Sequence, residues 1–123
     1  MALIKKFEDI IGWQEARKLV KDIYKITNNG TFARDFGLRD QIQRAAVSVM
    51  TNVAEGFDCD SQAEFARLLG YSRRSAVEMQ SLLYAALDIG YIDQVTFEAQ
   101  YKQTEKTKAL IGGLKTSLKK RTP

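Results

Sequence analysis

The fold class is decided by residues 61–90, which read SQAEFARLLGYSRRSAVEMQSLLYAALDIG. Ser61 and Glu64 have the spacing of a capping box, in which a hydroxyl and a carboxylate each bind a free backbone N–H at the start of a helix. Apolar residues then recur every three or four positions, as on one face of an α-helix: Phe65, Leu68, Leu69, Ala76, Met79, Leu83 and Ala86. Because Gly90 favours the left-handed backbone that ends helices, the stretch predicts a helix over residues 62–89.

Three further stretches on either side of this segment show the same periodicity. Their apolar residues predict helices over residues 11–28, 37–55 and 94–120. Gly56 is placed as the C-terminal cap of the second helix, and Asp93 as the N-terminal cap of the last. No stretch has the alternating pattern of a strand.

The connections between these helices set the expected topology. They are short, and the only proline is Pro123, so no helix is interrupted and successive helices should lie antiparallel. The sequence therefore predicts an all-α protein, an antiparallel up-down-up-down four-helix bundle formed as a single domain over residues 1–123.

The composition argues against an enzyme and against bound cofactors. The 123 residues include no His and one Cys, so the side chain most used for acid–base work near neutral pH is missing. Cys59 has acidic neighbours, which raise the pKa of a thiol and make it a poor nucleophile. The acidic loop around it matches no calcium-binding spacing; its members are Glu55, Asp58, Cys59, Asp60 and Glu64. We expect no catalytic residue, no metal, no cofactor and no small-molecule substrate.

The first residues and the hydropathy indicate the compartment. Four charged side chains fall within residues 1–9, before any apolar stretch of signal-peptide length. No segment reaches the roughly 20 apolar residues of a membrane-spanning helix. We expect a cytoplasmic protein without a membrane partner.

Polar residues on the second helix form a face beside its apolar stripe. If that helix pairs antiparallel with the third, this face meets polar residues there, and two ion pairs are expected, Arg44 with Glu78 and Glu55 with Arg67. We interpret the set as a structural polar seam between helices or between subunits, with a ligand-binding pocket as the alternative. The seam comprises Gln41, Arg44, Ser48, Asn52, Glu55, Arg67, Ser75 and Glu78.

Basic residues suggest a polyanionic partner. The chain has 19 Lys and Arg against 15 Asp and Glu, a net charge of +4 and a pI of about 9.2. The candidate nucleic-acid contacts are a stripe on the first helix, a pair on the third and an outer group at the C-terminus: Arg17, Lys21, Lys25, Arg73, Arg74, Lys119, Lys120 and Arg121. The alternative is that these charges are ordinary solvated helix faces.

Several motifs, in order along the chain, resemble one bacterial family. They include Phe7-Glu8-Asp9, Trp13-Gln14-x-Ala16-Arg17, Asn52-Val53-Ala54-Glu55-Gly56 and Leu87-x-x-Gly90-Tyr91. The chain is similar to the four-helix-bundle proteins encoded in intervening sequences of large-subunit rRNA genes, and to the related accessory variability proteins of diversity-generating retroelements. The resemblance implies a homopentamer, a basic surface that contacts nucleic acid, and no established enzymatic activity.

Two functions are open at this stage. The first is a non-enzymatic, homo-oligomeric RNA- or DNA-binding protein, an accessory subunit of a reverse transcriptase or of another RNA-containing particle. The second is a protein-interaction scaffold without nucleic-acid contact, suggested by aromatic residues beyond the needs of one small core: Trp13, Tyr24, Phe57, Tyr71 and Tyr91. Close packing against another helix or subunit is also expected at Gly112-Gly113 in the last helix, because glycines let another backbone approach closely.

Overall fold

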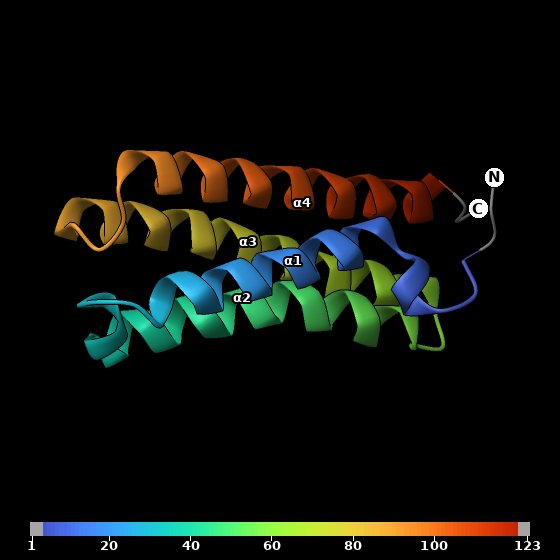
Figure 1. Ribbon diagram of the computed structural model, residues 1–123. Coiled ribbons are helices and arrows are strands. Elements are labelled where there is room, and N and C mark those ends of the chain that lie inside the picture. The colour runs from blue at the N-terminus through green and yellow to red at the C-terminus, as the bar shows by residue number, and fades with distance from the viewer. Residues whose placement is uncertain (1–3, 121–123) are drawn as a thin grey trace.

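The computed structural model describes residues 4–120, without the side chains of residues 119 and 120. Within that range the chain forms four long helices and two single-turn 3-10 helices, η1 (Phe7–Asp9) and η2 (Phe32–Arg34), with no strand. The four are α1 (Ile11–Thr27), α2 (Phe36–Phe57), α3 (Gln62–Ile89) and α4 (Gln94–Lys120). Successive helices run antiparallel (Figure 1), which confirms the all-α four-helix bundle.

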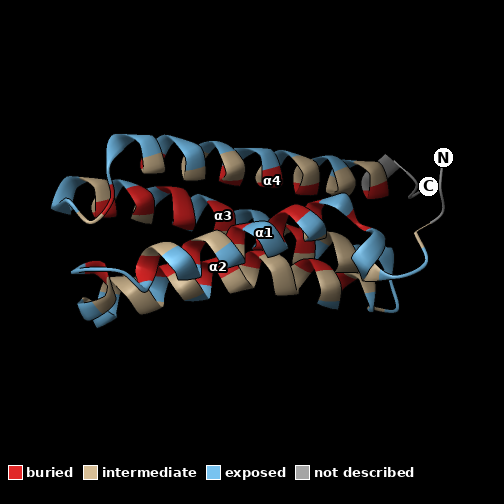
Figure 2. Ribbon diagram, in the orientation of Figure 1, coloured by how far each residue is buried: buried red, intermediate tan, exposed pale blue. Residues whose placement is uncertain are grey.

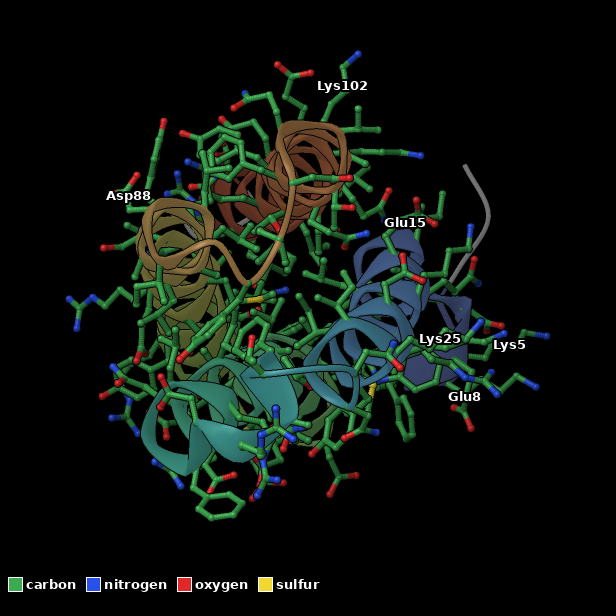
Figure 3. The ribbon with its side chains drawn as sticks, turned by 60° about the vertical axis from the view of Figure 1, so that its left-hand side comes forward. Lys5, Glu8, Glu15, Lys25, Asp88 and Lys102 are labelled. Atoms are coloured by element: carbon green, nitrogen blue, oxygen red, sulfur yellow. The ribbon has the colours of Figure 1, made fainter. Side chains whose placement is uncertain are left out.

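The four helices form a closed bundle with one helix at each corner. Each helix packs against the next along the chain, and α1 also packs against α4. Viewed nearly along the bundle, α1 and α3 lie at opposite corners (Figure 3). The outer surface of α1 is therefore separate from the surface that α3 shares with α4.

The apolar stripes meet along the axis of the bundle. All four helices contribute fully buried side chains, among them Leu19, Ile42, Leu83 and Ile111. The buried positions line the inner faces of the helices, while their outer faces are exposed (Figure 2). In the described range, no helix combines the length and the apolar character that a membrane crossing requires.

Three of the expected helix ends are confirmed. The hydroxyl of Ser61 accepts a hydrogen bond from the Glu64 N–H at 3.1 Å, and an Asp93 carboxylate oxygen accepts one from the Thr96 N–H at 2.8 Å. Gly90 ends α3 with φ of 91°. These local signals operate within one turn of the chain, so they can be recognised in the sequence.

The expected cap at Gly56 is wrong. α2 runs through Gly56 and ends at Phe57, and Gly56 is buried against α3. A Cβ at this position would lie 2.8 Å from Cδ1 of Phe65 and 3.2 Å from Cβ of Leu68. The missing side chain therefore serves the close approach of α2 and α3 rather than the end of a helix.

A second close approach joins α1 to α4. A Cβ at Gly12 would lie 3.1 Å from Cγ1 of Ile111, so the two helices meet closely at this glycine. Gly113, by contrast, has nothing within 4 Å of its Cβ position. Of the Gly112-Gly113 pair that the sequence suggested for close packing, only Gly112 has a near neighbour, the Arg73 side chain of α3, whose Nε lies 3.2 Å from its Cβ position.

Candidate functional site

A pocket lined by basic side chains lies between α3 and α4. Its volume is about 330 Å³. The residues lining it, here called the basic pocket, are Arg67, Gly70, Tyr71, Arg73, Arg74, Val77 and Lys115. Six of the seven come from α3, spaced so that they share one side of the helix, and Lys115 reaches them from the antiparallel α4.

Two glycines let cations cross between the helices. Lys115 Nζ on α4 lies 3.0 Å from the place a Cβ would take at Gly70 on α3. In return, Arg73 Nε on α3 lies 3.2 Å from the Cβ position of Gly112 on α4. Each of the two helices therefore has a glycine, and a cationic side chain of the other helix lies over it.

Arg67 is held in place on its own helix. Its guanidinium donates to both carboxylate oxygens of Glu64, at 2.7 and 2.6 Å, and to the hydroxyl of Tyr71 at 2.8 Å. These hydrogen bonds lower the pKa of the Glu64 carboxyl and raise the pKa of Arg67. Arg67 therefore stays charged and fixes the orientation of the Tyr71 ring.

The other three cations of the basic pocket form no ion pair in the described range. Within residues 4–120, no ion pair within 4 Å involves Arg73, Arg74 or Lys115. Arg73 is not isolated, however, because its charge acts on Glu105 of α4. The pKa of the Glu105 carboxyl is lowered by hydrogen bonds from Gln80 and Lys108 and, less, by the charges of Lys108 and Arg73. The guanidinium of Arg74 lies 5.9 Å from the centroid of Tyr71, which is a cation–π contact. Three positive charges beside a half-exposed ring form a surface suited to an anion such as a phosphate group.

The remaining candidate nucleic-acid contacts do not join the basic pocket. Arg17, Lys21 and Lys25 are exposed on α1, at the corner opposite α3. Arg17 lies 5.9 Å from the ring of Trp13. The candidates Lys119 and Lys120, as side chains, and Arg121 lie outside the described residues. The structure thus divides the candidates whose side chains it describes into two surfaces.

The polar seam lies between α2 and α3 of one chain. The hydroxyls of Ser48 and Ser75 are 2.7 Å apart, and the side-chain amide of Asn52 donates to the carbonyl and the hydroxyl oxygen of Ser48, both at 2.9 Å. Gln41 donates to the Glu78 carboxylate at 3.3 Å. The seam is thus a set of hydrogen bonds that joins two helices.

Neither ion pair expected in the seam forms within the described range. Arg67 pairs with Glu64 one turn earlier on its own helix, so Glu55 is left exposed without it. Glu78 accepts from Gln41 instead of from Arg44, which is exposed on α2. Arg67 is exposed and lines the basic pocket together with Lys115 of α4.

The side chains of Cys59, in the acidic loop, and of the buried Ser72 on α3 donate hydrogen bonds to backbone carbonyls of α2. In the part of the chain that the structure describes, no three His, Cys, Asp or Glu residues lie close enough to hold a metal ion. Cys59 donates to the Glu55 carbonyl at 3.3 Å, and the buried Ser72 hydroxyl donates to the Val49 carbonyl at 2.6 Å. Lys5 lies beside the acidic loop, lining one hollow together with Glu55.

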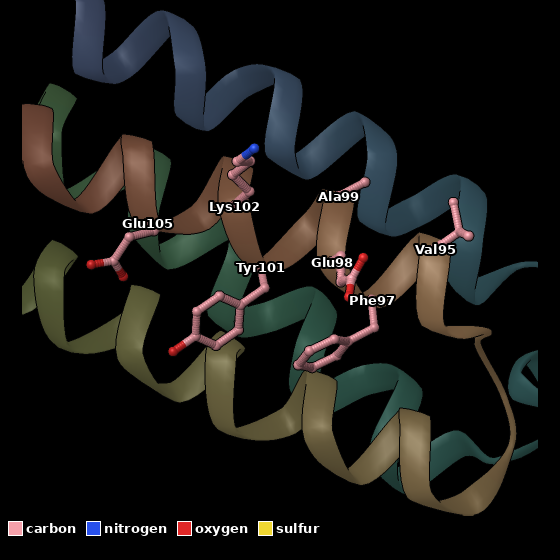
Figure 4. Close-up of a pocket in the computed structure, with 7 residues that line it drawn as sticks. All are labelled: Val95, Phe97, Glu98, Ala99, Tyr101, Lys102 and Glu105. Carbon is pink, nitrogen blue, oxygen red and sulfur yellow. The ribbon is translucent and has the colours of Figure 1, made fainter.

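A second hollow lies on α4, toward the other end of the bundle. It has a volume of about 590 Å³ and is lined by Val95, Phe97, Glu98, Ala99, Tyr101, Lys102 and Glu105. Figure 4 shows the rings of Phe97 and Tyr101 directed toward α3. There they meet Tyr84, whose ring centroid lies 4.8 Å from that of Phe97 and 5.8 Å from that of Tyr101. We call these three rings the aromatic cluster.

Sequence reasoning missed a buried carboxylate on α1. Glu15 is 6% exposed and pairs with Lys106 on α4 at 2.8 Å and with Lys18 at 2.7 Å. Hydrogen bonds from Lys106 and Lys18 lower its pKa to about 2. Its place in the sequence carried a signal, because Glu15 lies three residues after Gly12 and four before Leu19, both buried.

Comparison with known proteins identifies relatives of the whole bundle. The sequence pattern of the 23S rRNA-intervening sequence protein family matches residues 8–113. The fold is similar to a crystal structure of a protein of unknown function, from the S23 ribosomal protein family of Bacteroides thetaiotaomicron. The TM-score is 0.78 at 20% identity, over 85% of this chain and 97% of the other. No match to this chain was found among curated proteins.

Proposed function

The chain belongs to the 23S rRNA-intervening sequence protein family, and from this membership we propose that it is a non-enzymatic RNA-binding protein whose contact surface is the basic pocket. The observation that carries the proposal is the set of three cations without ion-pair partners, Arg73, Arg74 and Lys115, gathered at one crossing of two helices. Phosphate contacts need repeated Lys and Arg but no base-reading motif, so a plain helical surface can supply them.

The proposal includes self-assembly. Several large apolar side chains are more than half exposed on the single chain, among them Val95 at 76%, Phe36 at 62% and Ile11 at 61%. Burial of such residues between copies would stabilise an oligomer, and repetition would multiply the basic pockets offered to one polyanion. The homopentamer implied by the resemblance is the expected state. Light scattering should then give about five times the chain mass of 13.9 kDa.

Charge removal tests the RNA contact. Arg73, Arg74 and Lys115 are replaced together by Gln, and the binding of a fluorescent single-stranded RNA is followed by anisotropy at low salt. Loss of three phosphate contacts should weaken binding by at least about tenfold and make it less dependent on salt.

The matched control removes the other candidate surface. Replacing Arg17, Lys21 and Lys25 by Gln removes the same charge from α1, at the opposite corner of the bundle. It should change affinity by less than about threefold, through the net charge alone. A greater loss with the α1 variant, or binding unchanged in both, would contradict the assignment of the pocket. The same titration with DNA decides between the two nucleic acids.

A protein-interaction scaffold is the second candidate function. It is favoured by the hollow on α4, where Val95 is 76% exposed and the adjoining aromatic cluster presents more apolar surface. Association with a reverse transcriptase, which the resemblance to retroelement accessory proteins implies, belongs to the RNA-binding function proposed first rather than to this one. Co-purification of a protein partner after nuclease treatment, lost on Val95→Asp, would favour the scaffold.

A further inference from the structure

The pocket contains an aromatic ring as well as cations, and this points to one class of nucleic acid. We infer that the basic pocket takes a single strand rather than a duplex, with one unpaired base stacked on the ring of Tyr71 and phosphates held by the cations around it. The inference rests on the proposed function and deepens it, since it names the form of the ligand.

Tyr71 is the tyrosine that lines the basic pocket. It is 38% exposed, and in the described range no other aromatic ring packs against it. Its neighbours are the guanidiniums of Arg67 and Arg74, 5.3 and 5.9 Å from the ring centroid. Tyr84 and Tyr101, farther along the same two helices, pack on each other and on Phe97. A ring without such partners can accept the face of a base at little cost to the fold.

The ring is also held ready. The hydroxyl of Tyr71 accepts a hydrogen bond from Arg67, and Arg67 is fixed by its double contact with Glu64. A ring already fixed in place loses little freedom when a ligand binds, which favours affinity. Arg74 lies near the same ring but has no carboxylate partner within residues 4–120, so its planar guanidinium is free to stack on a base or to meet a phosphate.

The size of the pocket agrees with a nucleotide and not with a double helix. Its volume of about 330 Å³ is near the lower end of the roughly 300–1,000 Å³ found for pockets that hold small ligands. In a duplex the faces of the bases are covered by their neighbours, so a base would have to leave the stack to reach Tyr71. A single strand offers those faces directly.

Electrostatics alone predicts the opposite preference. The logarithm of the binding constant falls as the logarithm of the salt concentration rises. The slope is about 0.9 per neutralised phosphate for duplex DNA and about 0.7 for a single strand, so each phosphate contact contributes more in a duplex. A surface that only attracts phosphates should therefore bind duplexes at least as well. Preference for a single strand would require stacking, which makes the comparison informative.

The first experiment measures both forms with matched variants. Anisotropy gives the affinity of the full chain for an unstructured 20-nucleotide RNA and for the duplex of the same length. We expect the single strand to bind at least about fivefold more tightly, and Tyr71→Ala to weaken its binding about tenfold while changing duplex binding less than twofold. Tyr24→Ala on α1 is the control, because Tyr24 is 39% exposed, close to the 38% of Tyr71, and should change neither affinity.

The second experiment reads stacking directly. Trp13 is the only tryptophan, so Tyr71→Trp in a Trp13→Phe background gives a single fluorophore in the pocket. Single-stranded RNA should quench it, duplex RNA should not, and Tyr24→Trp in the same background should respond to neither.

The outcomes distinguish a failure of the single-strand inference from a failure of the proposed RNA-binding function. Equal binding of both forms, unchanged by Tyr71→Ala, would overturn the single-strand inference and leave the pocket as a phosphate-binding surface. Failure of both forms to bind, or binding that survives removal of the three free cations, would overturn the proposed function itself.

Discussion

The two halves of the surface shared by α3 and α4 use similar residues in different ways. In one half the rings of Tyr84, Phe97 and Tyr101 pack on one another. In the other half, Tyr71 has a half-exposed ring, and the arginines beside it take the place of other rings. Similar side chains therefore hold the fold together in one half and remain available for a ligand in the other.

The charges of the two halves differ in the same way. Beside the aromatic cluster, Glu105 accepts from Gln80 at 2.6 Å and pairs with Lys108 at 3.0 Å. In the basic pocket, Arg73 and Lys115 lie over glycine backbone and form no ion pair in the described range, although the charge of Arg73 also acts on Glu105. Because unpaired like charges repel one another, the pocket sacrifices some stability, as functional sites commonly do.

Deletion of one ring in each half should give the largest contrast. Phe97 is 7% exposed, so Phe97→Ala should lower the free energy of unfolding by about 3 kcal/mol. Tyr71→Ala should lower it by less than about 1 kcal/mol, because that ring is half exposed. Urea denaturation followed by circular dichroism measures both. Equal losses would show that Tyr71 is a structural residue, contrary to our account.

Deletion of one charge of each kind should give the next largest contrast. Glu15→Gln leaves Lys106 and Lys18 without their shared buried partner and should cost about 2 kcal/mol at pH 7, a value reduced by the exposure of both lysines. Lys115→Gln should be neutral or slightly stabilising, since it removes a repelling charge. Thermal melts of both variants provide the test, and a larger loss with Lys115→Gln would contradict the contrast.

The pH dependence follows from the pKa of Glu15. The pKa is about 2 in the folded protein, below the ordinary value of 4.5, so the ionised form stabilises the fold above pH 4.5. This stabilisation should disappear as the pH falls from about 4.5 toward 2. Melting curves of the native protein and of Glu15→Gln should therefore converge over that range, and curves that stay separated would argue against the ion pair.

Substitution of the two adjacent glycines of α4 should give the smallest contrast. Gly112→Ala and Gly113→Ala should each stabilise α4 by up to about 1 kcal/mol, from helix propensity. Only Gly112→Ala displaces Arg73, so only it should weaken RNA binding, by about two- to threefold. Anisotropy and thermal melts of the pair measure both effects. Equal binding by the two variants would show that the glycine does not position the cation.

The sequence predicted the parts of the fold that depend on local signals. Ser61, Gly90 and Asp93 act within a turn of their own helix, so their roles could be read directly. Gly56 was misread because its role depends on Phe65, which reaches it only when α2 and α3 pack. A glycine near the end of a helical pattern is compatible with both a cap and a close contact, and tertiary packing decides between them.

The site was less predictable than the fold. Arg73 and Arg74 were recognised as basic neighbours, but Arg67 was assigned to the seam with α2 because its rotation about α3 was unknown. Lys115 was not among the sequence candidates, because only the register of α4 against α3 places it over Gly70. The grouping of the four cations follows from that register.

Ultraviolet crosslinking tests most directly whether RNA meets the basic pocket. Four of the five tyrosines report on separate surfaces, with Tyr71 in the basic pocket, Tyr24 on α1, and Tyr84 and Tyr101 in the aromatic cluster, while Tyr91 stacks on Phe32. Single-stranded RNA is irradiated in complex with the full chain, and the crosslinked residues are identified by mass spectrometry. Our account predicts a principal crosslink at Tyr71, lost when Arg73, Arg74 and Lys115 are changed to Gln. A principal crosslink at Tyr24, or in the aromatic cluster, would contradict it.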